Sequence, residues 1–185
     1  MQKEFERKAA LSAAEFDALR TKLDKLAKGR IFTQENHYYD TEDFALKRSS
    51  RTLRVRKIGD ALTREYKHGK TVIGDIRVCT EDHIPIDALP SLIRGSEIGE
   101  SEDTVYLPLG VLTTERTEYV IEGACIALDK SMYLGIVDYE IEVETVGEKA
   151  LPSAVLSLQI DFSKETAGKY HRFVKRLLER KNITK

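Results

Sequence analysis

The sequence predicts an α+β fold in which antiparallel β-strands dominate. Eight short segments alternate polar and apolar residues with the period of two that is typical of half-buried strands. Two longer segments instead carry apolar residues at helical spacing. Glycine-containing turns at Gly59 and Gly69 join neighbouring strand candidates, as in β-hairpins.

The first helix is predicted at residues 13–28. Ser12 and Glu15 form a capping box, in which each residue satisfies a free backbone N–H of the other. Gly29 follows the apolar stripe, where a left-handed residue commonly ends a helix. The stripe consists of Phe16, Leu19, Leu23 and Leu26.

A second helix is predicted near residues 170–181, with basic residues toward its carboxyl end, where cations complement a helix. Its apolar stripe consists of Tyr170, Phe173, Val174, Leu177 and Leu178. Residues 85–99 and 151–158 are expected to contain shorter helical turns, because proline and glycine interrupt longer elements there.

The strand candidates cover most of the remaining sequence. They are residues 2–9, 38–46, 52–59, 62–69, 72–79, 113–123, 125–132 and 135–145. No low-complexity linker or internal repeat divides the chain, so we expect one domain spanning residues 1–185.

The charge balance excludes two broad classes of protein. Lys and Arg number 30 against 31 Asp and Glu, so the net charge is -1 although 33% of the residues are charged. This near cancellation argues against a generally basic nucleic-acid binder and against an acidic tail protein. Apolar runs are too short to span a bilayer, and the start MQKEFERK is too charged for a signal peptide. We therefore expect a cytoplasmic protein that binds neither membrane nor nucleic acid.

The two cysteines favour neither a disulfide nor a zinc site. Cys79 and Cys125 are isolated, without CxxC spacing or clustered histidines. A metal ion in this protein is therefore expected to have oxygen ligands.

Charged residues recur on one face of most predicted strands, because residues i and i+2 share a face. These rows are Glu4, Glu6 and Lys8; Arg54 and Arg56; Glu65 and Lys67; Arg116 and Glu118; and Glu140, Glu142 and Glu144. In an ordinary sheet such faces are solvated. However, three successive glutamates repel one another without cations among them, and helices could instead cover the apolar faces from outside.

A closed sheet would then enclose two kinds of charge with different ligands. Arginine and lysine match phosphate oxygens, whereas clustered carboxylates suit Mg²⁺ or Mn²⁺. A complex of a divalent cation with a polyphosphate would satisfy both sets.

These motifs resemble those of the CYTH proteins, also called triphosphate tunnel metalloenzymes. Glu4-Phe5-Glu6-Arg7-Lys8 resembles the family's E-x-E-x-K signature, and the other matches follow in the family's order along nearly the whole chain. They are Tyr38-Tyr39-Asp40-Thr41, Leu53-Arg54-Val55-Arg56, Glu65 with Lys67, Arg116, Asp129, Glu140 with Glu142, and Lys169.

The resemblance implies an eight-stranded antiparallel closed β-barrel that forms a tunnel, with helices packed outside, and a triphosphate-processing activity that needs Mg²⁺ or Mn²⁺. By this resemblance the metal ligands would be Glu4, Glu6, Glu140 and Glu142, with Glu144 as an addition. The triphosphate would be bound by Lys8, Arg54, Arg56, Lys67, Arg116 and Lys169. Basic residues, water or a second metal ion would be positioned by Glu65, Glu118 and Asp129.

Three functions remain open at this point. The first is hydrolysis of a small-molecule triphosphate, such as inorganic tripolyphosphate, thiamine triphosphate or a nucleoside triphosphate. The second is a class IV-type adenylate cyclase, although the sequence offers no recognisable nucleobase pocket. The third is a non-catalytic module, either one that binds polyphosphate or nucleotide or an interaction domain with solvated charges.

Overall fold

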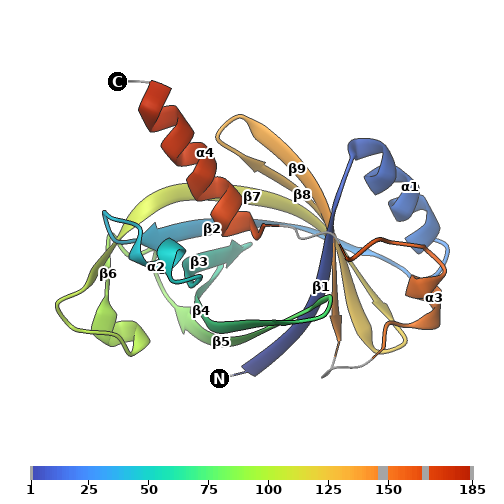
Figure 1. Cartoon of the computed structure of the whole chain (residues 1–185), viewed down its shortest axis with the longest axis horizontal. Coiled ribbons are helices and arrows are strands. Elements are labelled where there is room, and N and C mark those ends of the chain that lie inside the picture. The colour runs from blue at the N-terminus through green and yellow to red at the C-terminus, as the bar shows by residue number, and fades with distance from the viewer. Residues whose placement is uncertain (1, 146–149, 164–166, 184–185) are drawn as a thin grey trace.

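The computed structural model describes residues 2–145, 150–163 and 167–183, with backbone alone for residues 2–4 and 182–183. Eight antiparallel strands follow one another in the order β2-β3-β4-β5-β1-β9-β8-β7, and β7 pairs back with β2 to close a barrel (Figure 1). The predicted barrel is therefore confirmed. The strands are β1 Gln2–Leu11, β2 Arg30–Asp40, β3 Thr52–Ile58, β4 Ala61–Ile73, β5 Ile76–Ile86, β7 Val105–Ile121, β8 Ala124–Tyr133 and β9 Ile136–Thr145. The two-residue strand β6, Ile93–Arg94, pairs with β7.

The helices are α1 Ala13–Leu23, α2 Ala45–Arg48, α3 Ser153–Leu156 and α4 Lys169–Ile183, with the 3₁₀-helix η1 at Gly95–Ile98. Helices α1 and α3 pack on the outer side of the barrel wall, as predicted, whereas α4 packs over one end of the barrel (Figure 1). Within the described ranges, no helix has the length and apolar character needed to cross a membrane.

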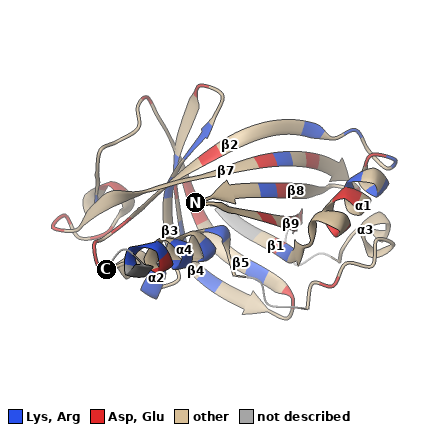
Figure 2. Ribbon diagram, turned by 90° about the horizontal axis from the view of Figure 1, so that it is seen from above, with Lys and Arg blue, Asp and Glu red and all other residues tan. Residues whose placement is uncertain are grey.

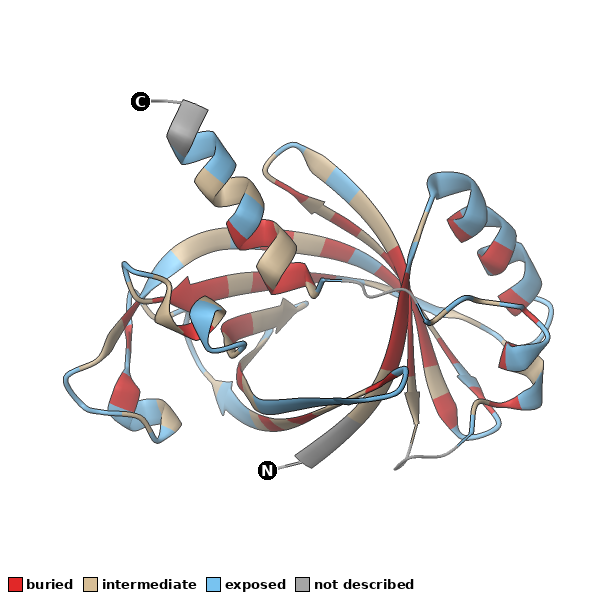
Figure 3. Cartoon of the chain, viewed as in Figure 1, coloured by how far each residue is buried: buried red, intermediate tan, exposed pale blue. Residues whose placement is uncertain are grey.

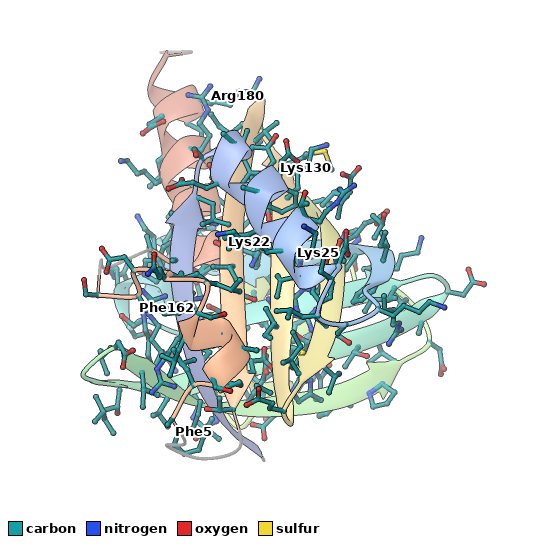
Figure 4. The ribbon with its side chains drawn as sticks, turned by 90° about the vertical axis from the view of Figure 1, so that its right-hand side faces the viewer. Phe5, Lys22, Lys25, Lys130, Phe162 and Arg180 are labelled. Atoms are coloured by element: carbon teal, nitrogen blue, oxygen red, sulfur yellow. The ribbon has the colours of Figure 1, made fainter. Side chains whose placement is uncertain are left out.

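Most of the hydrophobic core lies on the outer side of the barrel wall. Under α1 and α3, the first cluster joins Phe16, Leu19 and Leu23 to outward-facing residues such as Ile126 and Ile141. Figure 3 shows the buried residues of both helices, and in Figure 4 both helices cover the strands while Lys22 and Lys25 point away. Burying side chains of this size stabilises the fold by about 1.5–3 kcal/mol each.

Two further clusters complete the core, one on the outer wall and one at the end of the barrel that α4 covers. One lies beneath α2, β6 and η1 and is formed by Tyr39, Leu46, Leu53, Val55, Tyr66, Ile93 and Tyr106. The other lies beneath α4 and is formed by Tyr38, Leu112, Tyr133, Tyr170, Phe173 and Val174. Because the apolar residues gather in these clusters, much of the barrel interior is left to charged side chains.

Helix α4 packs against one end of the barrel interior. Tyr38 lies with its ring centroid 5.1 Å from Tyr170 and 5.3 Å from Phe173. A Cβ at Gly110 would lie 3.0 Å from the Phe173 ring, so this glycine leaves room for the helix. Asp40 accepts hydrogen bonds from the backbone N–H of Leu46 at 2.9 Å and from the Tyr170 hydroxyl. Asp40, in the Tyr-Tyr-Asp-Thr motif, therefore ties β2 to both α2 and α4.

The first helix is shorter than predicted. It begins with the expected capping box but ends at Leu23, and Leu26 is 49% exposed. Gly29 does not adopt a left-handed conformation; instead, a Cβ there would lie 2.7 Å from Cγ2 of Thr117 and 2.9 Å from the Tyr119 ring. The glycine therefore permits a close approach to β7, and the chain turns early to place β2 beside that strand.

Two strand predictions combine parts of different elements, and a third, residues 113–123, misses the first eight residues of β7. Residues 38–46 combine the end of β2 with a turn and α2, whereas most of β2 was missed because Ile31 and Phe32 interrupt the alternation. Residues 72–79 span the turn between β4 and β5, where Gly74 has φ +62°.

Three shorter features also differ from the prediction. Gly69 lies within β4 at a register shift rather than in a hairpin turn. Residues 85–99 contain the end of β5, strand β6 and η1, and within 151–158 the helix is limited to Ser153–Leu156.

Candidate active site

A cavity of about 270 Å³ lies inside the barrel and is lined mainly by charged side chains. Figure 2 shows basic and acidic segments next to one another along the strands. The lining bases are Lys8, Arg54, Arg56, Lys67, Lys70, Arg77, Arg116 and Lys169, and the lining carboxylates are Glu6, Glu118, Glu142 and Glu144. Since bases outnumber carboxylates two to one, the cavity suits a polyanion.

Strand register brings the predicted residues together. Lys8 of β1 lies opposite Glu142 of β9, and Glu6 lies opposite Glu144. Directly opposed residues of antiparallel strands point to the same face, so these four side chains all face the cavity. The sequence interpretation that the charged rows face inward is therefore confirmed for these strands.

Three carboxylates form the part of the site best suited to a metal ion. Glu6, Glu142 and Glu144 each offer an oxygen within 4.8 Å of the others, and all three line the cavity. Lys8 lies 2.9 Å from Glu6 and 3.4 Å from Glu142, so its ammonium group contacts two of these three carboxylates. An all-oxygen donor set fits a hard divalent cation such as Mg²⁺ or Mn²⁺.

Glu4 belongs to the same row of β1, because it precedes Glu6 by two residues and lies opposite Cys79 of β5. Its side chain falls outside the described part of the structure. Its role as a ligand stays a prediction.

Asp129 and Glu140 lie behind two of the bases rather than on the cavity wall. Asp129 is fully buried and accepts two hydrogen bonds from Arg116, at 2.8 and 2.6 Å. Lys169, from the first turn of α4, lies 2.8 Å from Asp129 and also contacts Glu140. Arg172 adds a contact of 2.6 Å to Glu140. These carboxylates therefore hold the bases in place.

A second backing pair lies on the opposite side of the barrel. Glu65 of β4 lies 2.6 Å from Arg54 and 3.2 Å from Arg56. Glu81 of β5 lies 3.3 Å from Lys67 and 3.6 Å from Arg54. Each of these bases therefore has a buried carboxylate behind it.

Sequence reasoning missed Glu81 and several lining residues, among them Arg77 and Lys70. Glu81 and His83 continue the row of alternate residues that starts at Arg77 and Cys79 on β5, and they were missed because the predicted strand ended at Cys79. Glu118 was predicted and does line the cavity.

The family model of the CYTH domain matches residues 2–172 of the chain. The chain belongs to the CYTH domain family. A protein of Bacillus subtilis (strain 168) named "Putative triphosphatase YjbK" is 31% identical over 190 residues, which is 92% of this chain and 93% of that protein.

Two solved structures share the CYTH barrel. One, described as a "putative adenylate cyclase" from Bacillus halodurans, has a TM-score of 0.70 and 28% identity over 94% of this chain and 99% of that one. The other, HpAC1 from Hippeastrum, is described as having a dominant triphosphatase activity. It has a TM-score of 0.72 and 23% identity over 93% of this chain and 95% of that one, a likeness that concerns the fold.

Electrostatics keep the carboxylates of this CYTH barrel ionised in spite of their burial. Burial by itself would raise the pKa of Asp129, but Lys169 and Arg116 more than offset this effect, and the pKa lies below its usual range. Burial likewise opposes ionisation of Glu142, and Lys169, Lys8 and Arg116 bring its pKa well below the ordinary value. The two carboxylates are therefore charged at neutral pH.

Cys125, one of the two cysteines that line the cavity, is unsuited to nucleophilic chemistry. Burial raises the pKa of Cys125 to about 12, with Glu118 and Glu144 adding to the effect. A thiol with such a pKa is protonated at neutral pH, and the thiolate is the nucleophilic form.

We expect the CYTH barrel to lose stability in acid because these carboxylates have lowered pKa values when folded. In the unfolded chain they titrate near pH 4 (about 3.9–4.3). Their contribution to the free energy of unfolding is therefore complete above that range and declines as the pH falls toward the folded pKa values. Urea denaturation between about pH 3 and 7 measures this decline.

The variant Glu142→Gln removes one of the responsible groups and should flatten the decline. Glu115→Gln, an exposed position on the outer face of β7, provides the matched control and should leave it unchanged. A free energy of unfolding that is constant down to about pH 3 would contradict the expectation.

Proposed function

We propose that this CYTH protein is a divalent-cation-dependent triphosphatase that acts on inorganic tripolyphosphate, thiamine triphosphate or a nucleoside triphosphate. The observation that carries the proposal is the arrangement of the cavity, in which a wall of bases adjoins a cluster of three carboxylates. The name of the B. subtilis relative, which aligns over nearly its whole length, supports the same reaction class.

In the proposed site the bases bind the phosphate oxygens. Arginine supplies a planar pair of donors to phosphate, and lysine supplies a mobile point charge. The proposed binding residues are Lys8, Arg54, Arg56, Lys67, Arg116 and Lys169. The positive charges of these side chains would stabilise the negative charge that develops on the transferred phosphoryl group.

The proposed cation ligands are Glu6, Glu142 and Glu144, with Glu4 beside them on β1 and Glu140 next to Glu142 on the same strand face. A divalent cation bound there would offset phosphate charge and increase the acidity of a water molecule. Glu118, on the cavity wall, is proposed to orient the attacking water. Glu65 and Asp129 are proposed to position the bases that they contact.

A substrate screen tests the proposal directly. Purified protein is incubated with tripolyphosphate, thiamine triphosphate, ATP or longer polyphosphate, with Mg²⁺, Mn²⁺ or EDTA, and phosphate release is measured. We expect cation-dependent release of phosphate from at least one triphosphate. Failure to release phosphate from any of them would overturn the proposal, and formation of cyclic AMP and pyrophosphate from ATP would indicate a cyclase instead.

Arg56→Ala is expected to raise KM about tenfold or more while changing kcat less. Arg56 is one of the more exposed bases of the cavity, and it would contribute a charge-assisted hydrogen bond of about 1.5–3 kcal/mol to the bound substrate. Steady-state kinetics measures both constants. Arg64→Ala, on the outer face of β4 where Arg64 pairs with Glu97, is the matched control. An unaltered KM in Arg56→Ala would remove this residue from the proposed site.

A further inference from the structure

His83 of β5 lies against the two buried carboxylates that back the bases on one side of the barrel. Its Nε2 is 3.1 Å from Glu81, and its Nδ1 is 3.7 Å from Glu65, the residue opposite it on β4. The side chains of Glu65 and Glu81 are 3% and 1% exposed, whereas that of His83 is 38% exposed. His83 therefore covers this carboxylate pair on its solvent side.

The two carboxylates are shared between His83 and the bases. Oε1 of Glu81 contacts Lys67, and Oε2 of the same carboxylate contacts His83. Glu65 directs Oε2 to Arg54 and Oε1 to both Arg56 and His83. Thus the pair contacts three bases that line the cavity, and also the imidazole of His83, which does not line it.

This arrangement has a consequence when a polyanion enters the cavity. Arg54, Arg56 and Lys67 would then direct N–H groups to phosphate oxygens and share them with the carboxylates behind. Two carboxylates with oxygens within 4.8 Å of each other repel, and they repel more strongly as the cations turn away. His83 is a hydrogen-bond donor that does not line the cavity, so it can keep the two carboxylates in place without itself binding the phosphate.

We propose that His83 is a positioning residue that fixes Glu81 and Glu65, and through them aims Arg54, Arg56 and Lys67 at the bound polyphosphate. The inference rests on the proposed function for the identity of the ligand, but it concerns binding rather than turnover. The contact to Glu81 is the main one, because 3.1 Å is a hydrogen-bonding distance and 3.7 Å to Glu65 is not. An Nε2–H that donates to Glu81 is sufficient for this role.

Calorimetric titration with tripolyphosphate in EDTA tests the inference on the whole chain. We expect His83→Ala and His83→Leu to raise the Kd for tripolyphosphate about tenfold, since the bases lose their fixed orientation. His83→Gln, whose amide can donate to Glu81, should recover a substantial part of the affinity. If turnover is observed, the same variants should raise KM with kcat changed less than about twofold.

His37→Ala is the matched control, because His37 pairs with the half-buried Glu35 at 3.1 Å on β2 and does not line the cavity. It should leave the Kd unchanged. Wild-type affinity in both His83→Ala and His83→Leu would overturn the inference, as would a His83→Gln variant as weak as His83→Leu or a wild type that does not bind tripolyphosphate. A wild type that binds but releases no phosphate would overturn the proposed function while leaving the role of His83 to be decided by the Kd values.

Discussion

Lys169→Met is expected to lower the free energy of unfolding by about 3–5 kcal/mol, the cost of removing one partner from a buried ionic cluster. Lys169 is almost completely buried, and its ammonium group contacts Asp129, Glu140 and Glu142. Methionine keeps the length of the side chain but leaves these carboxylates with fewer cations. Arg116 beside Asp129 and Arg172 beside Glu140 would then be the nearest cations left to balance these negative charges.

Urea denaturation at pH 7 measures this loss. Lys175→Met, at an exposed position of the same helix, is the matched control and should change stability by less than about 0.5 kcal/mol. A loss below about 1 kcal/mol in Lys169→Met would mean that the ionic cluster relaxes without its lysine. Such a small loss would contradict the conclusion that Lys169 balances the charge of the buried carboxylates.

Glu6→Gln is expected to reduce kcat of the proposed cation-dependent reaction at least about 100-fold, which corresponds to about 3 kcal/mol of lost transition-state stabilisation. Glu6 lines the cavity, and its carboxylate lies with those of Glu142 and Glu144 in the cluster that fits a cation. The amide keeps the size of the side chain but removes a charged ligand oxygen. Lys8 retains a contact with Glu142, so we expect little change in folding.

Two measurements separate this role from a structural one. Calorimetric titration with Mn²⁺ should show weaker cation binding in Glu6→Gln than in the wild type. The Tm of the variant in EDTA should be close to that of the wild type. Glu115→Gln, on the outer face of β7 beside Lys130, should match the wild type in both. Full turnover in Glu6→Gln would exclude Glu6 as a ligand.

The inward-facing charged rows could be predicted from sequence because they depend on a period of two within single strands. Arg54 with Arg56, and Glu140 with Glu142 and Glu144, needed no knowledge of strand neighbours. Which carboxylates line the cavity, and which lie behind the bases, could not be predicted in this way. Glu142 and Glu140 belong to the same row, yet Glu142 lines the cavity and Glu140 lies behind Lys169.

The missed features have local physical causes. Glu81 and His83 were lost because the segment 72–79 crosses a turn, which interrupts the period of two and hides the length of β5. Strand β2 was largely missed because apolar and polar residues do not alternate regularly along it, so its two faces cannot be told apart from the sequence. In both cases the pairing with neighbouring strands, rather than the residue pattern of the segment, determines the structure.

The position of β1 determines when the site can form during synthesis. Its two neighbours are β5 and β9, and the cavity also needs Lys169, which follows all of the strands. While a chain emerges from the ribosome, Glu6 and Lys8 are made first but have no partners until much later. Pairing between such distant segments is slow compared with local contacts. A nascent chain is therefore expected to acquire polyphosphate affinity in one late step, after α4 has been synthesised and has packed onto the barrel.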